Sequence, residues 1–141
     1  MSDAKRAAGR PVREQVRAEH RRLYGLLRDV RDAFYAEDGG ASVREAFAGL
    51  RRELESHFDQ EDRFYYAPIA EHHPELKPTF DAFAAEHVRL RRELAALTEQ
   101  LDRGDLEGAS PAVLEMALGF ERHESEEEEV LRHLDPLLDE D

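Results

Sequence analysis

Apolar residues recur along this chain at alternating steps of three and four, the spacing that places side chains on one face of an α-helix. Four stretches follow this rule, and breaks containing Gly, Pro and Asp separate them. We call the face so defined the seam of each stretch, and the pattern predicts four amphipathic helices around one core. The seams consist of Val16, His20, Leu23, Leu27, Val30 and Phe34; of Val43, Phe47, Leu50, Leu54, His57, Glu61 and Phe64; of Phe80, Phe83, His87, Leu90, Leu94, Leu97 and Leu101; and of Val113, Met116, Phe120, His123, Glu127, Val130 and Leu134.

Local signals predict where the helices begin and end. Ser42 and Glu45 have the spacing of a capping box, so we expect them to start the second helix. Ser110 can cap the fourth helix with Pro111 in its first turn, and Pro136 is expected to end it. The expected helices span residues 11–36, 42–71, 78–102 and 111–134.

The connections between these stretches are short, which makes consecutive helices antiparallel neighbours. No stretch shows the alternation of a β-strand, and β-branched residues are few. We therefore predict an all-α protein, an up-down-up-down antiparallel four-helix bundle over residues 11–136. Residues 1–10 are expected to be a disordered N-terminus and residues 137–141 an acidic tail.

Six ionisable residues occupy seam positions where leucine would be expected. Burying such groups is costly unless they are paired or bind a metal. Counted from the connecting turns, the six lie at one level of the bundle to within about 3 Å. We predict a metal site there and keep one alternative, a metal-free core of hydrogen-bonded or ionic pairs. The six residues are His20, His57, Glu61, His87, His123 and Glu127.

The same ligand order occurs twice in the chain. Residues 19–23 (EHRRL) resemble residues 86–90 (EHVRL), and residues 57–61 (HFDQE) resemble residues 123–127 (HESEE). The repeat predicts a pseudo-twofold relation between helix pairs.

The number of ligand atoms favours two metal ions. If both glutamates bridge, the site supplies four imidazole nitrogens and four carboxylate oxygens, and about four of the twelve coordination positions of two octahedral metals remain. An oxo or hydroxo bridge would take two, leaving one open position on each metal.

Composition narrows the ligands and the partners. The chain has no cysteine, so a metal would be held by imidazole and carboxylate groups, which suit iron, manganese, zinc or copper. The formal net charge of −13 argues against nucleic acid and anionic membranes as partners. No apolar run is long enough to span a bilayer and no signal segment is evident, so we expect a cytoplasmic protein without membrane contacts.

On these residues the chain resembles the hemerythrin-like, or HHE cation-binding, family, whose order is His, His-x-x-x-Glu, His, His-x-x-x-Glu. The resemblance covers nearly the whole chain. It implies two iron ions that bind or react with dioxygen, peroxide or nitric oxide. It further implies that Glu61 and Glu127 bridge the irons, and that the terminal ligands are His20, His57, His87 and His123.

Two positions depart from the oxygen-carrying hemerythrins. Arg91 stands where those proteins have a further histidine, and Glu127 comes one residue earlier than their final aspartate. The pattern is closer to the di-iron domain of iron-centre repair proteins, whose separate cysteine-bearing region has no counterpart here. This implies a role in oxidative or nitrosative stress or in iron handling. The alternative is a non-catalytic iron or oxygen sensor or iron-binding module. A ferritin-like site is disfavoured, because its Glu-x-x-His motif does not occur.

Three residues one turn from the expected ligands are further candidates: Tyr24, Tyr65 and Arg91. They would hydrogen-bond a ligand or a bound oxidant, or else pack at the rim with their polar ends in water. Glu19 and Glu86 precede a histidine in each repeat and either orient a neighbouring imidazole or face solvent. The pattern leaves open whether the site is catalytic, and it leaves the oligomeric state open.

Overall fold

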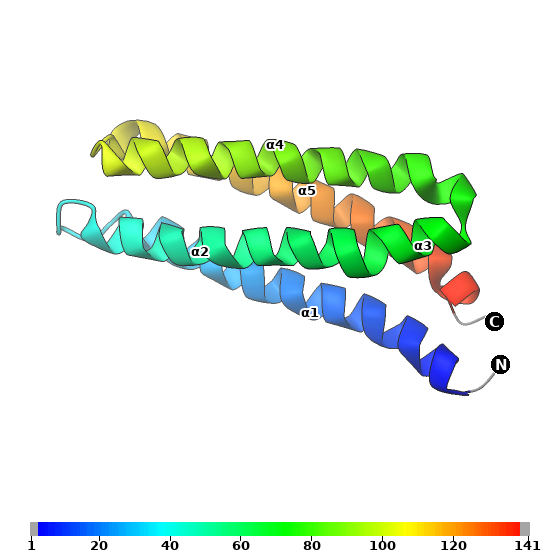
Figure 1. Ribbon diagram of the computed structural model, residues 1–141. Helices are drawn as coiled ribbons and strands as arrows, with labels where there is room; N and C mark the ends of the chain where they lie inside the picture. Colours follow the sequence, from blue (N-terminus) through cyan, green and yellow to red (C-terminus); the bar gives the residue numbers. More distant parts are fainter. Residues whose placement is uncertain (1–2, 139–141) are drawn as a thin grey trace.

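The computed structural model describes the backbone of residues 3–138 and the side chains of residues 14–134. Within this part the chain is helical, without strands, as the seam pattern predicted (Figure 1). Both expected terminal segments, residues 1–10 and 137–141, lie outside the residues whose side chains are described. None of the described helices is both long and apolar enough to cross a membrane. The four long helices are α1 (Asp3–Ala33), α2 (Ala41–Gln60), α4 (Lys77–Asp102) and α5 (Leu106–Leu138).

Three short elements complete the chain between α2 and α4. The π-helix η1 (Glu61–Tyr66) follows α2 directly and leads into α3 (Ala67–His72). The 3-10 turn η2 (Pro74–Leu76) then connects α3 to α4. The second expected helix is therefore one continuous rod whose middle is wound more widely than an α-helix.

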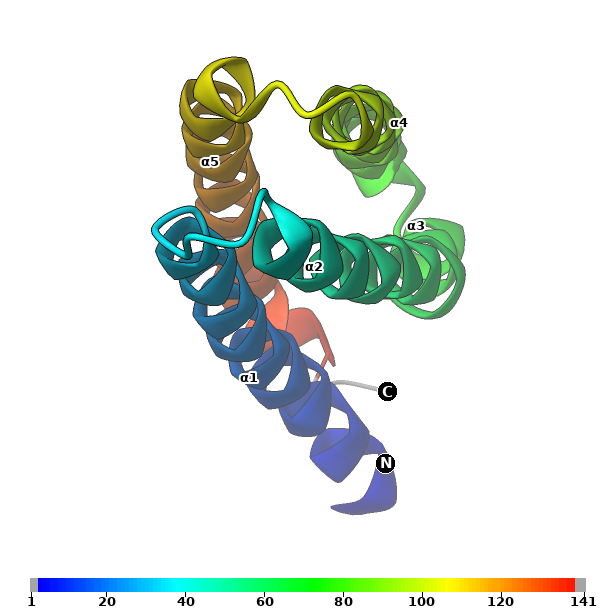
Figure 2. The same cartoon turned by 90° about the vertical axis from the view of Figure 1, so that its left-hand side faces the viewer.

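The long helices enclose a single core. Helix α1 packs against α2 and α5, and α4 packs against the same two helices. Viewed from the end where α1 leads into α2, the four helices surround a common centre, with α1 opposite α4 and α2 opposite α5 (Figure 2). The first turn of α1 and the last turn of α5 lie at the other end of the bundle (Figure 1). A side chain at mid-height on any seam therefore points at the same volume.

The capping residues differ from those expected. Gly40, not Ser42, is the N-cap residue of α2. The carboxylate of Asp38, two residues earlier, accepts hydrogen bonds from the backbone N–H groups of Gly40 (3.2 Å) and Ser42 (3.0 Å), and from the Ser42 hydroxyl. Gly40 has φ +91°, a conformation that side-chain-bearing residues rarely adopt. The expected capping box fails because the tight Gly turn brings Asp38 to the helix end first.

Helix α5 is longer at both ends than predicted. It begins at Leu106, where the carboxylate of Asp105 accepts a hydrogen bond from the Gly108 N–H at 3.0 Å. Ser110 is therefore not the cap, and Pro111 lies in the second turn. Pro136 does not end the helix, which continues to Leu138. Each of the two prolines lacks the backbone N–H that would bond to the carbonyl four residues earlier, so each removes one hydrogen bond from this long helix, which tolerates the loss.

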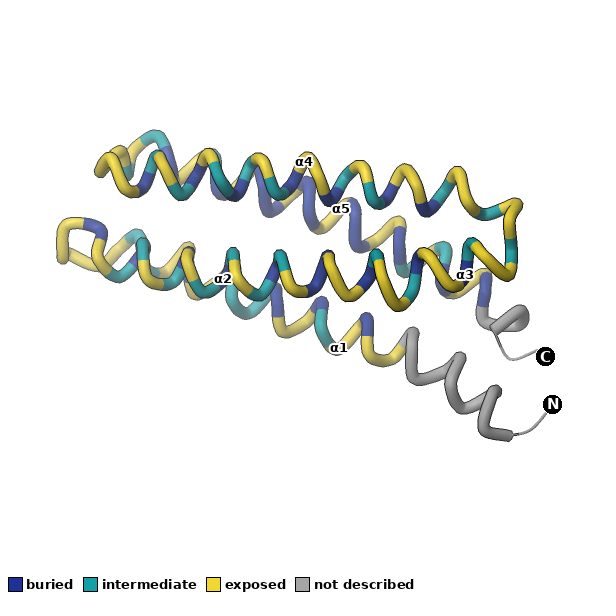
Figure 3. Tube along the Cα trace, viewed as in Figure 1, coloured by how far each residue is buried: buried dark blue, intermediate teal, exposed yellow. Residues whose placement is uncertain are grey.

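Burial follows the predicted seams closely (Figure 3). A large apolar cluster fills the bundle from the α1–α2 turn to Phe58, and it includes Leu23, Leu50 and Leu94. A smaller cluster around Phe80 lies toward the chain ends. Buried polar residues lie between the two clusters. The core therefore has a polar layer with apolar packing above and below.

The predicted seams fail after the polar layer. Phe64, expected in the core, is 65% exposed, while Tyr66 is 4% exposed. The π-turn adds a residue to the turn after Glu61, so the next inward side chain comes five residues later. In α5 the seam continues through Leu131, and Val130 is only partly buried.

Candidate metal centre

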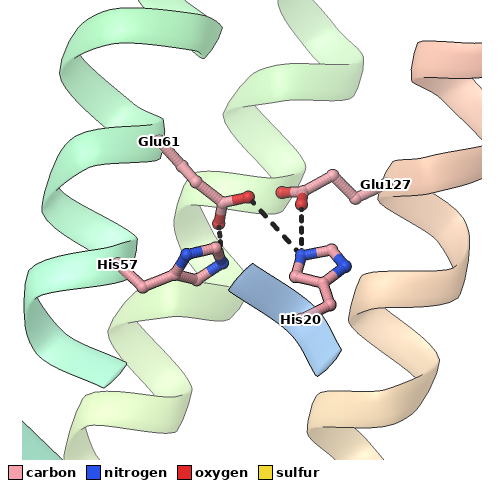
Figure 4. A group of neighbouring side chains, drawn as sticks. All are labelled: His20, His57, Glu61 and Glu127. Carbon is pink, nitrogen blue, oxygen red and sulfur yellow. Dashed lines mark ion pairs between the residues drawn. The ribbon is translucent and has the colours of Figure 1, made fainter. Parts of the chain in front are cut away.

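The six residues singled out from the sequence meet in the polar layer, and all are buried. They form two overlapping groups whose potential ligand atoms lie within 4.8 Å of one another. One group consists of His20, His57, Glu61 and Glu127, which converge in Figure 4. The other consists of Glu61, His87, His123 and Glu127. We call the first the α1–α2 half and the second the α4–α5 half; the two glutamates belong to both.

Helix periodicity explains why each half can gather its groups. His57 and Glu61 are four residues apart, so they lie on one face, with Nε2 and Oε1 3.3 Å apart. His123 and Glu127 repeat this spacing on α5, at 3.8 Å between Nε2 and Oε2. Across the bundle, His87 Nε2 lies 3.1 Å from Glu61 Oε1. Two donors bound at right angles to one octahedral ion, each at about 2.1 Å, would lie about 3 Å apart.

Each histidine is held from behind by a carboxylate on a neighbouring helix. The carboxylate faces Nδ1 in every case: three of the four contacts are hydrogen bonds, and the fourth, at His123, is a longer ion-pair contact without hydrogen-bond geometry. This arrangement favours a proton on Nδ1 and leaves Nε2 facing the centre. This is the outer arrangement usual for imidazoles that bind a metal. The pairs are His20 with Glu128 at 3.0 Å, His57 with Glu19 at 2.9 Å, His87 with Asp62 at 2.9 Å and His123 with Glu86 at 3.4 Å.

The atoms that face the centre lack partners. Among the described residues no hydrogen bond of good geometry reaches Nε2 of His20 or His57, either carboxylate oxygen of Glu61, or Oε1 of Glu127. The Nε2 atoms of His87 and His123 face each other at 3.0 Å. Two lone pairs at that distance repel unless a cation or a proton lies between them. The donors therefore fit a metal better than they fit one another.

The electrostatics of the metal-free layer are unbalanced. Burial and the charge of Glu127 raise the pKa of Glu61 well above its usual range. Burial alone would lower the pKa of His20, but the carboxylates of Glu127 and Glu124 outweigh it and raise that pKa to about 9. Burial and the neighbouring His123 lower the pKa of His87 to about 3. Without a metal, His20 is therefore protonated at neutral pH while His87 is neutral, so the histidines of the two halves differ in charge.

The three further candidates from the sequence lie outside the centre. Tyr24 packs edge-on against Phe120, with the ring centroids 6.3 Å apart, and burial and the charge of the neighbouring Glu124 raise the pKa of Tyr24 above its usual range. The Tyr65 hydroxyl donates to the side-chain oxygen of Gln15 at 3.2 Å. Arg91 lies 3.9 Å from Asp62 and over the Phe58 ring, 5.6 Å from its centroid, so it contacts two residues that flank His87 and not the centre itself.

Two residues at the centre were not predicted. The Tyr66 hydroxyl donates a hydrogen bond to Glu127 Oε2 and lies 3.4 Å from His87 Nε2. Burial and the charges of Glu127 and Glu61 raise the pKa of Tyr66, so its hydroxyl keeps the proton it donates. Glu124 is fully buried, with Oε2 3.0 Å from His20 Nε2, and burial raises its pKa to about 8.

A surface pocket of about 370 Å³ lies between α3 and α4. Asp62 and Tyr66 form part of its lining, together with Phe80 and Ala84. Because Tyr66 also contacts Glu127, its side chain separates this pocket from the polar layer. A small molecule in the pocket would therefore be one side chain away from the α4–α5 half.

The family comparison agrees with the geometry. The model of the hemerythrin HHE cation-binding domain matches residues 12–134, nearly the whole chain, so the protein belongs to that family. Comparison with curated proteins and with solved structures gave no match. The family and the two His/Glu groups together support a metal-binding function.

Proposed function

We propose that the chain binds two iron ions in its polar layer, with His20 and His57 as terminal ligands of one ion and His87 and His123 of the other. Glu61 and Glu127 would bridge the pair. The observation that carries this proposal is that the two ligand groups share these two glutamates and no other residue. The inward-facing nitrogen and oxygen atoms without hydrogen-bond partners support it.

We further propose that the two halves are related by a pseudo-twofold axis and that the bundle is antiparallel. The contacts behind the histidines support this relation. Glu19 on α1 contacts a histidine of α2, and Glu86 on α4 contacts a histidine of α5. Asp62 and Glu128, each directly after a shared glutamate, reach back to α4 and α1. Equivalent positions therefore play equivalent parts in the two halves.

The proposed activity is binding of, or reaction with, a small oxidant such as dioxygen, peroxide or nitric oxide, in oxidative or nitrosative stress or in iron handling. An iron pair would supply the oxidant-binding positions and the electrons. The chain supplies a buried site with apolar packing on both sides, which restricts water. It also supplies a proton at the Tyr66 hydroxyl, beside Glu127, on the side that faces the pocket.

Metal analysis tests the proposal directly. Protein produced with adequate iron should contain about two irons per chain, and its optical spectrum should change on adding peroxide. The double variant Glu61→Gln/Glu127→Gln should lose both ions. Asp59→Asn/Glu126→Gln is the matched control, because it makes the same change of charge at exposed positions beside the same segments. Less than one transition metal per wild-type chain would refute the proposal.

A sensor role is the second candidate, and one observation favours it. Every long helix contributes at least one residue to the polar layer. Occupancy of the site would therefore alter the stability of the whole bundle. An iron-loaded protein that consumes none of the three oxidants, yet melts at a temperature strongly dependent on iron, would support this role over catalysis.

A further inference from the structure

Glu124 is a buried carboxyl group that the six-ligand site does not explain. Its side chain is fully buried on α5, and no described residue makes a well-formed hydrogen bond to either carboxylate oxygen. A buried carboxylate without partners is among the most costly groups in a protein interior. A proton, or a cation bound beside it, must therefore neutralise it.

The position of Glu124 favours a cation. Its Oε2 lies 3.0 Å from His20 Nε2, the same atom that lies 3.1 Å from Glu127 Oε1. Because His20 Nδ1 is already engaged by Glu128, Nε2 is the atom that His20 offers to both carboxylates, and a metal would take the place of the proton between them. Nε2 and the two carboxylate oxygens lie at the separation expected of donors around one cation.

The other half of the site has no such group. In the internal repeat, Phe58 follows His57 as Glu124 follows His123. The Phe58 ring stacks on His87, with the ring centroids 4.3 Å apart. Equivalent positions therefore place a carboxylate against the histidine of α1 and an apolar ring against the histidine of α4. The difference is confined to side-chain chemistry, because both positions are buried.

We propose that Glu124 is a seventh metal ligand, which binds only the ion of the α1–α2 half. This rests on the proposed metal-binding function and refines it. The ion beside His20 and His57 gains an anionic ligand where an exogenous molecule would otherwise bind. The ion beside His87 and His123 keeps its open position, next to Phe58 and Tyr66 and on the side of the pocket. Small ligands then bind one ion of the pair and not the other.

Titration of metal-free protein with Co²⁺ tests the assignment, since the visible absorption of this ion reports its coordination. Wild type should bind two ions per chain in two steps of unequal affinity. Glu124→Gln should weaken one ion by about tenfold or more and leave the other unchanged. Glu121→Gln, an exposed position one turn earlier on α5, is the matched control and should bind as wild type does.

Each result has a separate meaning. Two ions bound by Glu124→Gln with wild-type affinities and absorption would overturn the assignment, even if the metal-free variant melts at a different temperature, because Glu124 would then only pack against His20. No ion bound by wild type would instead refute the proposed function. Mössbauer spectra of iron-loaded wild type need no variant: two iron environments are expected, and one environment would overturn the assignment.

Discussion

The segments that follow the two shared glutamates start alike and then diverge. After Glu61 the chain forms a π-turn, and the next buried side chain is Tyr66, five residues on. After Glu127 the chain stays α-helical, and the next buried side chain is Leu131, four residues on. One added residue therefore replaces an apolar side chain by a phenol that contacts the polar layer. Helix winding, and not ligand choice alone, distinguishes the two halves.

Deleting one residue from each segment should break this comparison most strongly. Without Phe64, the π-turn can become an α-turn that still directs the present Tyr66 inward, so the loss of stability should be small. Without Glu129, α5 after the deletion rotates by about 100°, and Leu131 and Leu134 leave the core, at a cost of about 3–6 kcal/mol. Urea denaturation measures both. Equal losses of unfolding free energy in the two deletion variants would show that the π-turn does not arise from one additional residue in the helix.

Alanine substitutions of the π-turn aromatics compare the buried Tyr66 with the exposed Phe64. Tyr66→Ala should cost about 3–5 kcal/mol of unfolding free energy, because it removes a buried ring packed between Phe80 and His87. Phe64→Ala should change stability by less than about 0.5 kcal/mol. The reverse order would mean that the helix keeps the α-register predicted from the sequence.

The carboxylates behind the histidines offer a comparison of intermediate size. Asp62→Asn should weaken metal binding by the α4–α5 half, and Glu128→Gln should weaken it by the α1–α2 half, each by about 10–100-fold. Competition with a chelator gives the affinities. Asp81→Asn, exposed on α4, is the control and should bind metal as wild type does. Glu128→Gln and Glu124→Gln should affect the same ion, because both residues contact His20.

The smallest expected effect concerns a single hydroxyl. Tyr66→Phe keeps the ring and removes the hydrogen bond to Glu127, which should cost the metal-free protein about 1–3 kcal/mol. Tyr65→Phe, which removes a partly exposed hydrogen bond to Gln15, is the matched control and should cost less. If the two variants lose equal stability, the Tyr66 hydroxyl does not act on the polar layer.

The sequence was sufficient for the helices and for the six residues that share a level. Both follow from spacing, since a three-four alternation fixes one face of a helix and equal distances from a turn fix one height. The hemerythrin-like family, recognised on the same residues, is confirmed. The caps were missed because Asp38 and Asp105 act through turns whose geometry depends on glycine conformation and not on a linear motif.

Tyr66 and Glu124 could not be obtained from periodicity. The three-four spacing of apolar residues does not reveal a π-turn, because Phe64 lies three residues after Glu61 and fits an α-helical seam. Phe64 was therefore predicted to be buried in the position that Tyr66 occupies. Glu124 lies in a segment with several glutamates, and the sequence alone does not distinguish it from the exposed Glu126 two residues later. The internal repeat held a clue: Glu124 aligns with Phe58, and an aromatic residue beside a seam marks a position that points inward.

The carboxylates behind the histidines form a closed circuit. Each helical segment orients a histidine of the next, from α1 to α2, from η1 to α4, from α4 to α5, and from α5 back to α1. One hairpin of two helices completes only one of these four contacts by itself. Two copies of a single hairpin, placed face to face, would complete all of it. On the pseudo-twofold relation proposed above, the site has the architecture of a dimer of hairpins joined into one chain, in which the two copies are free to differ, as Phe58 and Glu124 do.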